Sequence, residues 1–151
     1  MKTTGIITIS LLIVAGLGLS AVVACPLCPK KDSAQNVETS NPEHAVKESS
    51  DASFNDDVIA STKPVLVDFY ATWCGPCKKM GPVVENLSKE YGDKIAVWKV
   101  NVDRNPSLSS EYRIQSIPAI KLFRNGKVVD EALGLTPASE LRSKIDKAIS
   151  R

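Results

Sequence analysis

The chain has 151 residues and a formal net charge of +2, with 43% hydrophobic and 24% charged residues. This length and composition fit one compact globular domain with some additional sequence. A charge so close to zero gives no electrostatic reason to expect nucleic acid as a partner. The four cysteines form two Cys-x-x-Cys pairs, which are too few and too clustered to hold a disulfide-rich fold together. Redox or metal chemistry is therefore favoured.

Residues 1–24 have the pattern of an export signal or a membrane anchor. Thr3–Ala24 follows Lys2, contains no charged residue and ends in small residues, as the apolar region and cleavage site of a signal peptide do. The segment is also long enough to span a membrane as a helix. The sequence Val-Val-Ala-Cys at 22–25 is similar to a bacterial lipobox, in which Cys25 is lipidated. Lipidation, cleavage alone and retention as an anchor remain open, and each predicts an extracytoplasmic domain, membrane-attached in the first and third cases.

The next segment, 25–52, is predicted to be a flexible tether. It is rich in Ser, Asn, Lys, Glu and Pro and contains no aromatic residue, so it cannot bury enough apolar surface to offset its chain entropy. With coil statistics its span is roughly 25–30 Å, enough to hold a domain clear of a bilayer.

Residues 53–151 begin with a helix, a strand and a second helix. Ser53 is predicted to cap the first helix, whose first turn contains two acids. Val65–Tyr70 is a short run of β-branched and aromatic residues, which predicts a buried strand. Cys74–Tyr91 has apolar residues at helical spacing, and Gly92 beyond it is a helix stop signal.

The rest of the domain alternates in the same way. Lys94–Val102 predicts a second strand, and residues 105–113 predict a short helix. Asn125-Gly126 between two alternating runs predicts a β-hairpin. Thr136 is predicted to cap a last helix over Pro137–Ile149. Strands separated by helices imply parallel crossovers, so the pattern predicts an α/β domain with a mixed sheet and helices on both faces.

The second cysteine pair lies where the first predicted strand ends and a helix begins. The Cys74 sulfur would face unpaired backbone N–H groups and the positive end of the helix dipole, which favours the thiolate form. Cys77 follows one turn later, so the two sulfurs can form a disulfide without backbone movement. Two cysteines acting only as small apolar residues would not explain the adjoining Trp73 or the intervening Gly75-Pro76. A redox pair is predicted.

The motif Trp-Cys-Gly-Pro-Cys-Lys at 73–78, preceded by Val-Asp-Phe-Tyr-Ala-Thr at 67–72, resembles the active site of the thioredoxin family. The resemblance covers 53–151 and implies the thioredoxin fold, with a mixed central sheet of about four strands whose first strand is weak or absent here. Cys74 then corresponds to the attacking thiol and Cys77 to the resolving thiol. Pro82 matches a proline inside the active-site helix, where it removes one internal hydrogen bond.

Asp68 has apolar residues on both sides in a strand that is predicted to be buried. Burial of an unpaired carboxylate is costly and raises its pKa, whereas a solvent-facing strand position is the simpler alternative. The resemblance implies that Asp68 is the family's buried aspartate, which exchanges a proton with the resolving thiol. Lys99 matches the family lysine near that aspartate, although an ordinary lysine at a strand edge has the same sequence pattern.

Ile117-Pro118 begins another predicted part of the site. An isolated Ile-Pro bond is cis in only about 5% of cases, but the resemblance implies that Pro118 is a cis-proline lying against the active-site sulfurs. The Ile117 backbone would then pair with an extended client segment. The resemblance also implies an apolar rim that receives the client, formed by Trp73, Gly75, Pro76, Ile117 and Gly134.

The implied activity is reduction of client protein disulfides by dithiol-disulfide exchange outside the cytoplasm. Gly75-Pro76 resembles the dipeptide of reducing family members, whereas a histidine between the cysteines would favour an oxidant. The sequence has no dinucleotide or flavin fingerprint. No cofactor is therefore expected beyond a redox-active Cys74–Cys77 disulfide, and electrons are expected from a membrane thiol carrier. A monomer that binds no nucleic acid is expected.

Two other functions stay open. A disulfide oxidase or isomerase of the same fold is the main alternative. A metal site formed by both cysteine pairs is disfavoured, because 45 residues lie between Cys28 and Cys74, compared with roughly 12–20 in common zinc modules. No metal ligand is therefore predicted.

Overall fold

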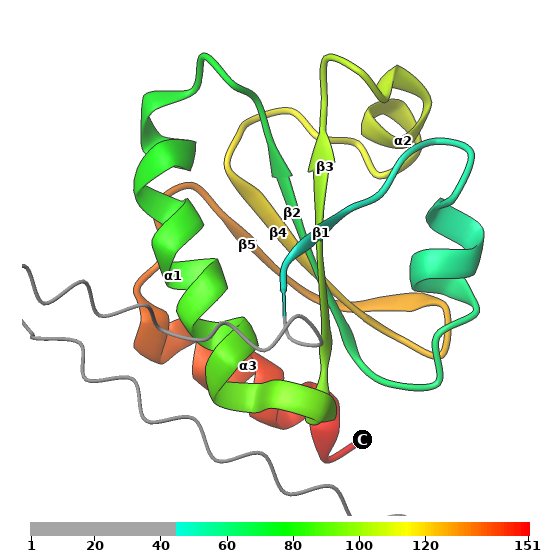
Figure 1. Ribbon diagram of the computed structural model, residues 1–151, viewed down its shortest axis with the longest axis vertical. Helices are drawn as coiled ribbons and strands as arrows, with labels where there is room; N and C mark the ends of the chain where they lie inside the picture. Colours follow the sequence, from blue (N-terminus) through cyan, green and yellow to red (C-terminus); the bar gives the residue numbers. More distant parts are fainter. Residues whose placement is uncertain (1–44) are drawn as a thin grey trace, which may run out of the picture. The chain divides into compact units, whose positions relative to one another are not determined.

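The computed structural model describes residues 45–151. Their elements, in chain order, are β1 (Lys47–Glu48), η2 (Asn55–Ile59), β2 (Val65–Tyr70), α1 (Gly75–Tyr91), η3 (Gly92–Lys94), β3 (Ala96–Asn101), α2 (Pro106–Glu111), β4 (Ala119–Arg124), β5 (Lys127–Leu133) and α3 (Ala138–Ile149). The five strands form one sheet in the order β1-β3-β2-β4-β5 (Figure 1). β1, β3 and β2 are parallel, whereas β4 and β5 are antiparallel to their neighbours. The predicted mixed α/β sheet is confirmed.

Helices cover both faces of the sheet, as the sequence predicts. α1 and α3 lie on one face, whereas η2 and α2 lie on the other (Figure 1). Successive residues of a strand point to opposite faces, so Leu66 of β2 belongs to the apolar cluster under α1 and α3. Val65, Val67 and Phe69 belong to the cluster under η2 and α2. Each face of the sheet therefore has an apolar core of its own.

The central strand β2 positions the residues that precede the cysteines. Five of its six residues are buried, and it is paired with β3 on one side and β4 on the other. The register places Asp68 beside Lys99 of β3 and Ile120 of β4. Asp68 lies on the same face as Leu66, which is the face that α1 covers.

The first strand is short, in agreement with the expectation of a weak one. β1 contains only Lys47–Glu48, and the backbone N–H of Ser49 donates to the Lys99 carbonyl over 2.9 Å. These residues lie within 25–52, the range predicted as a tether, so the sheet begins before the predicted domain start at Ser53. Both strand residues are polar and exposed, which is why no hydrophobic alternation indicates this strand.

Two predicted helix caps are wrong. The N-cap residue of η2 is Phe54, one residue after Ser53, and the Ser53 hydroxyl accepts a hydrogen bond from the Ser50 backbone N–H over 3.1 Å. The N-cap residue of α3 is Pro137, one residue after Thr136, and the Thr136 hydroxyl donates to the Gly134 carbonyl over 3.3 Å. In both cases the helix begins one residue later than predicted, and the hydroxyl bonds to the backbone of the preceding turn, as Ser and Thr side chains readily do.

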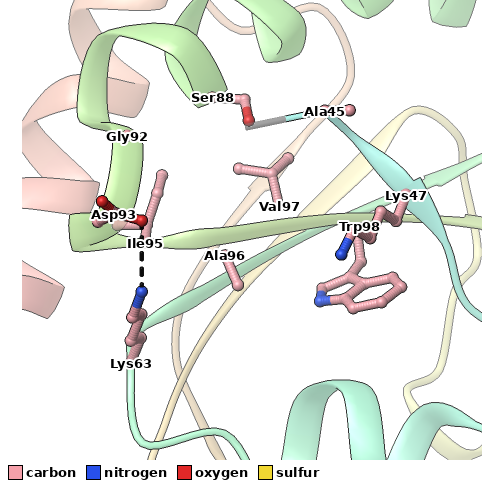
Figure 2. A pocket seen from close by; sticks show the side chains of 10 residues that line it. All are labelled: Ala45, Lys47, Lys63, Ser88, Gly92, Asp93, Ile95, Ala96, Val97 and Trp98. Atoms are coloured by element: carbon pink, nitrogen blue, oxygen red, sulfur yellow. Dashed lines mark ion pairs between the residues drawn. The ribbon is translucent and has the colours of Figure 1, made fainter. Parts of the chain in front are cut away.

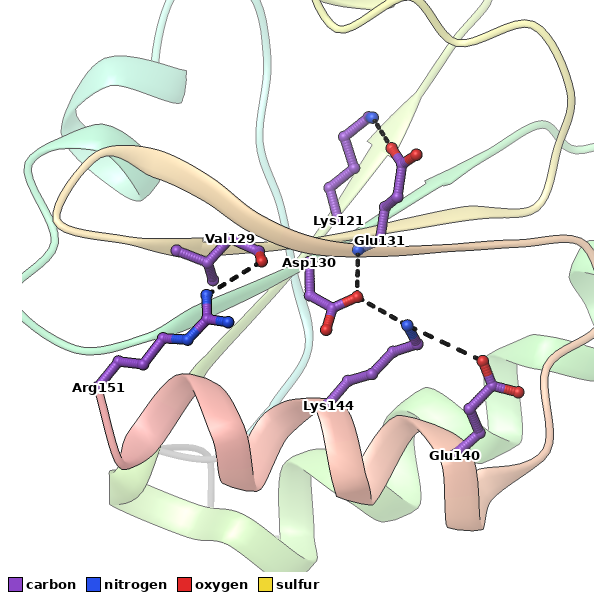
Figure 3. A network of polar contacts seen from close by, with 7 residues as sticks. All are labelled: Lys121, Val129, Asp130, Glu131, Glu140, Lys144 and Arg151. Atoms are coloured by element: carbon purple, nitrogen blue, oxygen red, sulfur yellow. Dashed lines mark hydrogen bonds and ion pairs between the residues drawn. The ribbon is translucent and has the colours of Figure 1, made fainter.

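Polar contacts fix both sides of β5, which leads into Gly134. On one face Asp130 accepts from Lys144 of α3 over 2.7 Å, and on the other Lys121 donates to Glu131 over 2.7 Å (Figure 3). Arg151, at the chain end, donates to the Val129 carbonyl over 3.3 Å. These contacts attach the edge strand to α3 and to β4.

The predicted hairpin is confirmed, since Asn125-Gly126 connects β4 to β5. Both residues are left-handed, with φ of 51° and 73°, as a two-residue turn of this kind requires. A Cβ at Gly126 would lie 3.1 Å from both Cγ2 and the carbonyl oxygen of Ile59. Backbone conformation and close approach therefore both require glycine at this position.

We expect Gly126→Ala to lower the free energy of unfolding by about 1–2 kcal/mol, because alanine adds left-handed strain and a close contact. Urea unfolding measures the change. Asn125→Gly is the matched control and should differ from the wild type by only a few tenths of a kcal/mol, since glycine adopts the same φ without strain. Equal midpoints for Gly126→Ala and the wild type would contradict this account of the turn.

Candidate active site

The two cysteines of the second pair lie at the junction between β2 and α1. Cys74 is the N-cap residue of α1, Cys77 is in its first turn, and a disulfide joins them. The Cys77 backbone N–H donates to the Cys74 sulfur over 3.1 Å. In the reduced protein this N–H and the helix dipole favour the thiolate form of Cys74. Gly75 and Pro76 are exposed between the two cysteines.

The disulfide itself is almost completely buried. Cys74 and Cys77 are only 4% and 5% exposed, and they form a small apolar cluster with Ala71. Three partly buried residues pack against this cluster, namely Tyr70, Val102 and Ile117. A client disulfide must therefore reach the sulfurs through the surface formed by the neighbouring loops.

The loop before β4 brings the other predicted residues to the cysteines. The Ile117-Pro118 peptide is cis, as the family resemblance implies. Ile117 contacts the cysteine cluster, and Pro118 is buried. The Pro118 carbonyl accepts a hydrogen bond from the Gly134 backbone N–H over 2.8 Å. This hydrogen bond joins the loop before β4 to the loop after β5. Gly134 has a φ of 74°, a conformation that favours glycine.

Exposed apolar side chains lie on the segments that carry the site. Trp73 is 68% exposed, and its indole N–H donates to the Asp103 carboxylate over 2.9 Å, which fixes the ring. Leu133 and Leu135, on either side of Gly134, are 60% and 55% exposed. Exposed apolar groups of this kind are typical of protein-binding surfaces. Sequence reasoning missed Asp103, Leu133 and Leu135, although the position of both leucines beside Gly134 was an available signal.

Asp68 is a buried carboxyl group without a local partner. It is 1% exposed, and neither of its oxygens has a hydrogen-bond partner within residues 45–151. Desolvation raises the pKa of Asp68 from 3.8 to about 6, although the positive charge of Lys99 counteracts part of this rise. A carboxyl group with this pKa can take up and release a proton close to neutral pH.

Lys99 lies beside Asp68 in the strand register, in agreement with the resemblance. Its ammonium is 3.9 Å from a carboxylate oxygen of Glu85 and 5.6 Å from the centre of the Tyr70 ring. The structure thus places Ile117 against the cysteine pair and Lys99 beside Asp68, whereas Cys25 lies outside the described residues. The proton-transfer role of Asp68 and any role of Lys99 stay predictions.

Two further features of residues 45–151 bear on the site. No group of three or more His, Cys, Asp or Glu side chains in this part of the chain could hold a metal ion.

A pocket lined partly by Lys63, Asp93 and Trp98 has a volume of about 160 Å³ (Figure 2). It lies where β3 begins, whereas Cys74 follows the end of β2, and these two strands are parallel. The pocket is therefore separate from the cysteine pair.

Comparisons with known proteins agree with the geometry. The family model described as Thioredoxin matches residues 45–147. Thioredoxin 1 of Synechococcus elongatus is 46% identical over 97 residues, which cover 64% of this chain and 91% of the relative. Thioredoxin of Rickettsia prowazekii is 48% identical over 99 residues, which cover 66% of this chain and 94% of the relative.

A solved structure has the same fold. The crystal structure of Malassezia sympodialis thioredoxin (Mala s 13) is similar with a TM-score of 0.64 and 38% identity, covering 70% of this chain and 91% of that chain. Thioredoxins need no cofactor, because their own cysteine pair carries the electrons. The chain belongs to the thioredoxin family and is a thiol-disulfide oxidoreductase that acts on client protein disulfides by dithiol-disulfide exchange.

Proposed function

We propose that this thioredoxin is an exported, membrane-attached reductase of client disulfides. The observation that carries the direction of electron flow is the short Gly75-Pro76 link between the cysteines, which contains no ionisable side chain. A histidine there would stabilise the Cys74 thiolate further, and a more stable thiolate makes the oxidised pair a stronger oxidant. Without it, the dithiol form is the better electron donor.

The reaction begins with the reduced pair. The Cys74 thiolate attacks one sulfur of the client disulfide, so the client S–S bond breaks and the first client sulfur leaves and takes up a proton. A mixed disulfide now joins Cys74 to the client. Cys77 gives its proton to Asp68 and attacks the Cys74 sulfur, which breaks the bond to the client. The second client sulfur leaves and is protonated. Two electrons have then reached the client, and Cys74–Cys77 is a disulfide.

The cis-proline loop and the apolar rim hold the client during this exchange. Ile117 packs against the cysteine cluster, and its backbone can pair there with an extended client segment as an added short strand. Trp73 and the exposed residues around Gly134 supply apolar contacts that do not depend on one client sequence. This arrangement supports a reductase that acts on several clients.

The proposed export rests on the sequence before the described residues. Thr3–Ala24 is uncharged, and Cys25 follows it in a lipobox-like context. Within residues 45–151, no helix is both long and apolar enough to cross a bilayer. Attachment is therefore assigned to Cys25 lipidation or to the apolar segment itself. A membrane thiol carrier would return two electrons to the Cys74–Cys77 disulfide after each turnover.

The redox direction is tested by equilibrating the Cys74–Cys77 pair with thiol-disulfide buffers of defined potential. We expect a reduction potential of about −270 mV, as in reducing thioredoxins. Pro76→His should make the potential less negative by at least about 30 mV, a tenfold change in the equilibrium constant. A wild-type reduction potential of about −120 mV would favour the oxidase alternative and contradict the reductase proposal.

The buried Asp68 predicts a stability that depends on pH. Since its folded pKa of about 6 exceeds its ordinary value of 3.8, the folded state binds more protons than the unfolded state between these values. Stability contributed by the protonated group is therefore lost as pH rises from about 4 to about 6. Asp68→Asn should be more stable than the wild type by up to about 3 kcal/mol at pH 8, and nearly equal at pH 4.

Urea unfolding at the two pH values measures this difference. A difference that does not increase with pH would show that Asp68 is not a buried ionisable group. The same variant should release a client more slowly from a Cys74 mixed disulfide at pH 7, because Cys77 lacks its base.

Export and attachment are tested by the mass and the cell fraction of the mature protein made in bacteria. We expect a lipid-modified chain that begins at Cys25 and fractionates with membranes. Cys25→Ser should abolish the lipid, whereas Cys28→Ser, the matched control, should leave it in place. A full-length chain in the cytosolic fraction would contradict the proposed export.

A further inference from the structure

Two acids compete for the side chain of Lys99, one on the neighbouring strand β2 and one on α1. Asp68 is its register partner on β2, and Glu85 lies on α1 above the same face of the sheet. The ammonium forms its ion pair with Glu85, at 3.9 Å, and both Asp68 oxygens lack a hydrogen-bond partner among residues 45–151. The lysine side chain is long and flexible and has three donors, so it could adopt other rotamers. The residues around Lys99 therefore determine whether its ammonium pairs with Glu85 or with Asp68.

We propose that Glu85 is a positioning residue, which holds the Lys99 ammonium away from Asp68 so that the buried carboxyl can exchange a proton with Cys77. This role rests on the proton transfer assigned to Asp68 above. Glu85 itself touches neither the sulfurs nor the client in this scheme and acts only through Lys99.

The alternative pairing would weaken Asp68 as a proton acceptor. A hydrogen bond from the ammonium to Asp68 would stabilise the carboxylate and lower the pKa of Asp68. A carboxylate with a lower pKa is a weaker base, so it takes a proton from the Cys77 thiol less readily near neutral pH. In the observed arrangement Lys99 acts on Asp68 through its charge alone, and desolvation remains the larger effect on the pKa of Asp68.

The helices above Asp68 offer few other charges. The titratable groups of α1 on this side are Cys77, Glu85 and Tyr91, and the Tyr91 hydroxyl donates to Asp146 over 2.9 Å. A Cβ at Gly81 would lie 3.7 Å from the Lys99 ammonium, so the ammonium lies close to the α1 backbone. The remaining buried residues of α1 and α3 in the cluster are apolar, namely Met80, Val84, Leu87, Leu141 and Ile145.

The neighbouring strands add one acid and one phenol. Ile120 of β4, the other register partner of Asp68, is apolar. Glu48 of β1 is in register with Lys99, but its carboxylate accepts the hydroxyl of Tyr70. Tyr70 in turn presents its ring to the Lys99 ammonium at 5.6 Å. Among the described residues, Glu85 is therefore the carboxylate within 4.0 Å of the Lys99 ammonium that competes with Asp68.

Glu85→Gln tests the role, because it removes the charge and keeps the shape. The readout is the titration of the Asp68 carboxyl carbon by ¹³C NMR in the full chain. We expect the pKa of Asp68 to fall by about half a unit, since exposed ion pairs are weak and Glu85 is 58% exposed. Glu90→Gln is the matched control. Glu90 is an exposed acid of α1 that pairs with Arg142, so the pKa of Asp68 should not change.

A second pair of variants separates positioning from a direct effect of the Glu85 charge. In a Lys99→Met background Glu85→Gln should leave the pKa of Asp68 unchanged, because the ammonium through which Glu85 acts is absent. An equal fall in both backgrounds, or no fall in the wild-type background, would overturn the proposal. The titration needs no turnover. A failure of the Asp68 role itself would appear differently, as a normal rate of client release by Asp68→Asn.

Discussion

The fixed position of β2 at the centre of the sheet is the constraint on which the site depends. The strand is paired on both edges and covered on both faces, so it cannot slip. A shift of one residue would exchange the two faces, turning Asp68 away from α1 and Leu66 out of its cluster. Because the strand cannot move, α1 begins at a defined point, and the Cys74 sulfur lies at the helix N-terminus.

The same rigidity explains how a buried, unpartnered carboxyl can persist. Ionised Asp68 destabilises the fold, since burial raises its pKa to about 6 and no hydrogen bond from the described part of the chain compensates its desolvation. The apolar clusters on both faces of the sheet supply the opposing stability. A hydrophobic residue at this position would be less costly, but it could not transfer a proton. If Asp68 transfers a proton as proposed, stability and chemistry conflict at this residue, as they often do at functional sites.

Local sequence predicted those elements whose causes are local. Asn125-Gly126 specifies its turn through its backbone conformations, and the spacing of Cys74 and Cys77 at a strand-to-helix junction permits a disulfide. β1 could not be predicted in this way, because Lys47–Glu48 forms a strand only through its pairing with β3. The cis state of Ile117-Pro118 came from the family resemblance, since an Ile-Pro bond alone favours trans. The partner of Lys99 depends on how α1 packs on the sheet, which no short stretch of sequence encodes.

The chemistry and the proposed location depend on separate parts of the chain. Every residue assigned to the exchange reaction lies within the described residues, whereas the proposed export rests on Thr3–Ala24 and Cys25. The two proposals nevertheless meet at one requirement. A dithiol with a low potential becomes oxidised in an oxidising compartment unless electrons are supplied continuously. If the domain is exported and acts as a reductase, a donor must therefore carry two electrons across or from the membrane for each client disulfide that is reduced.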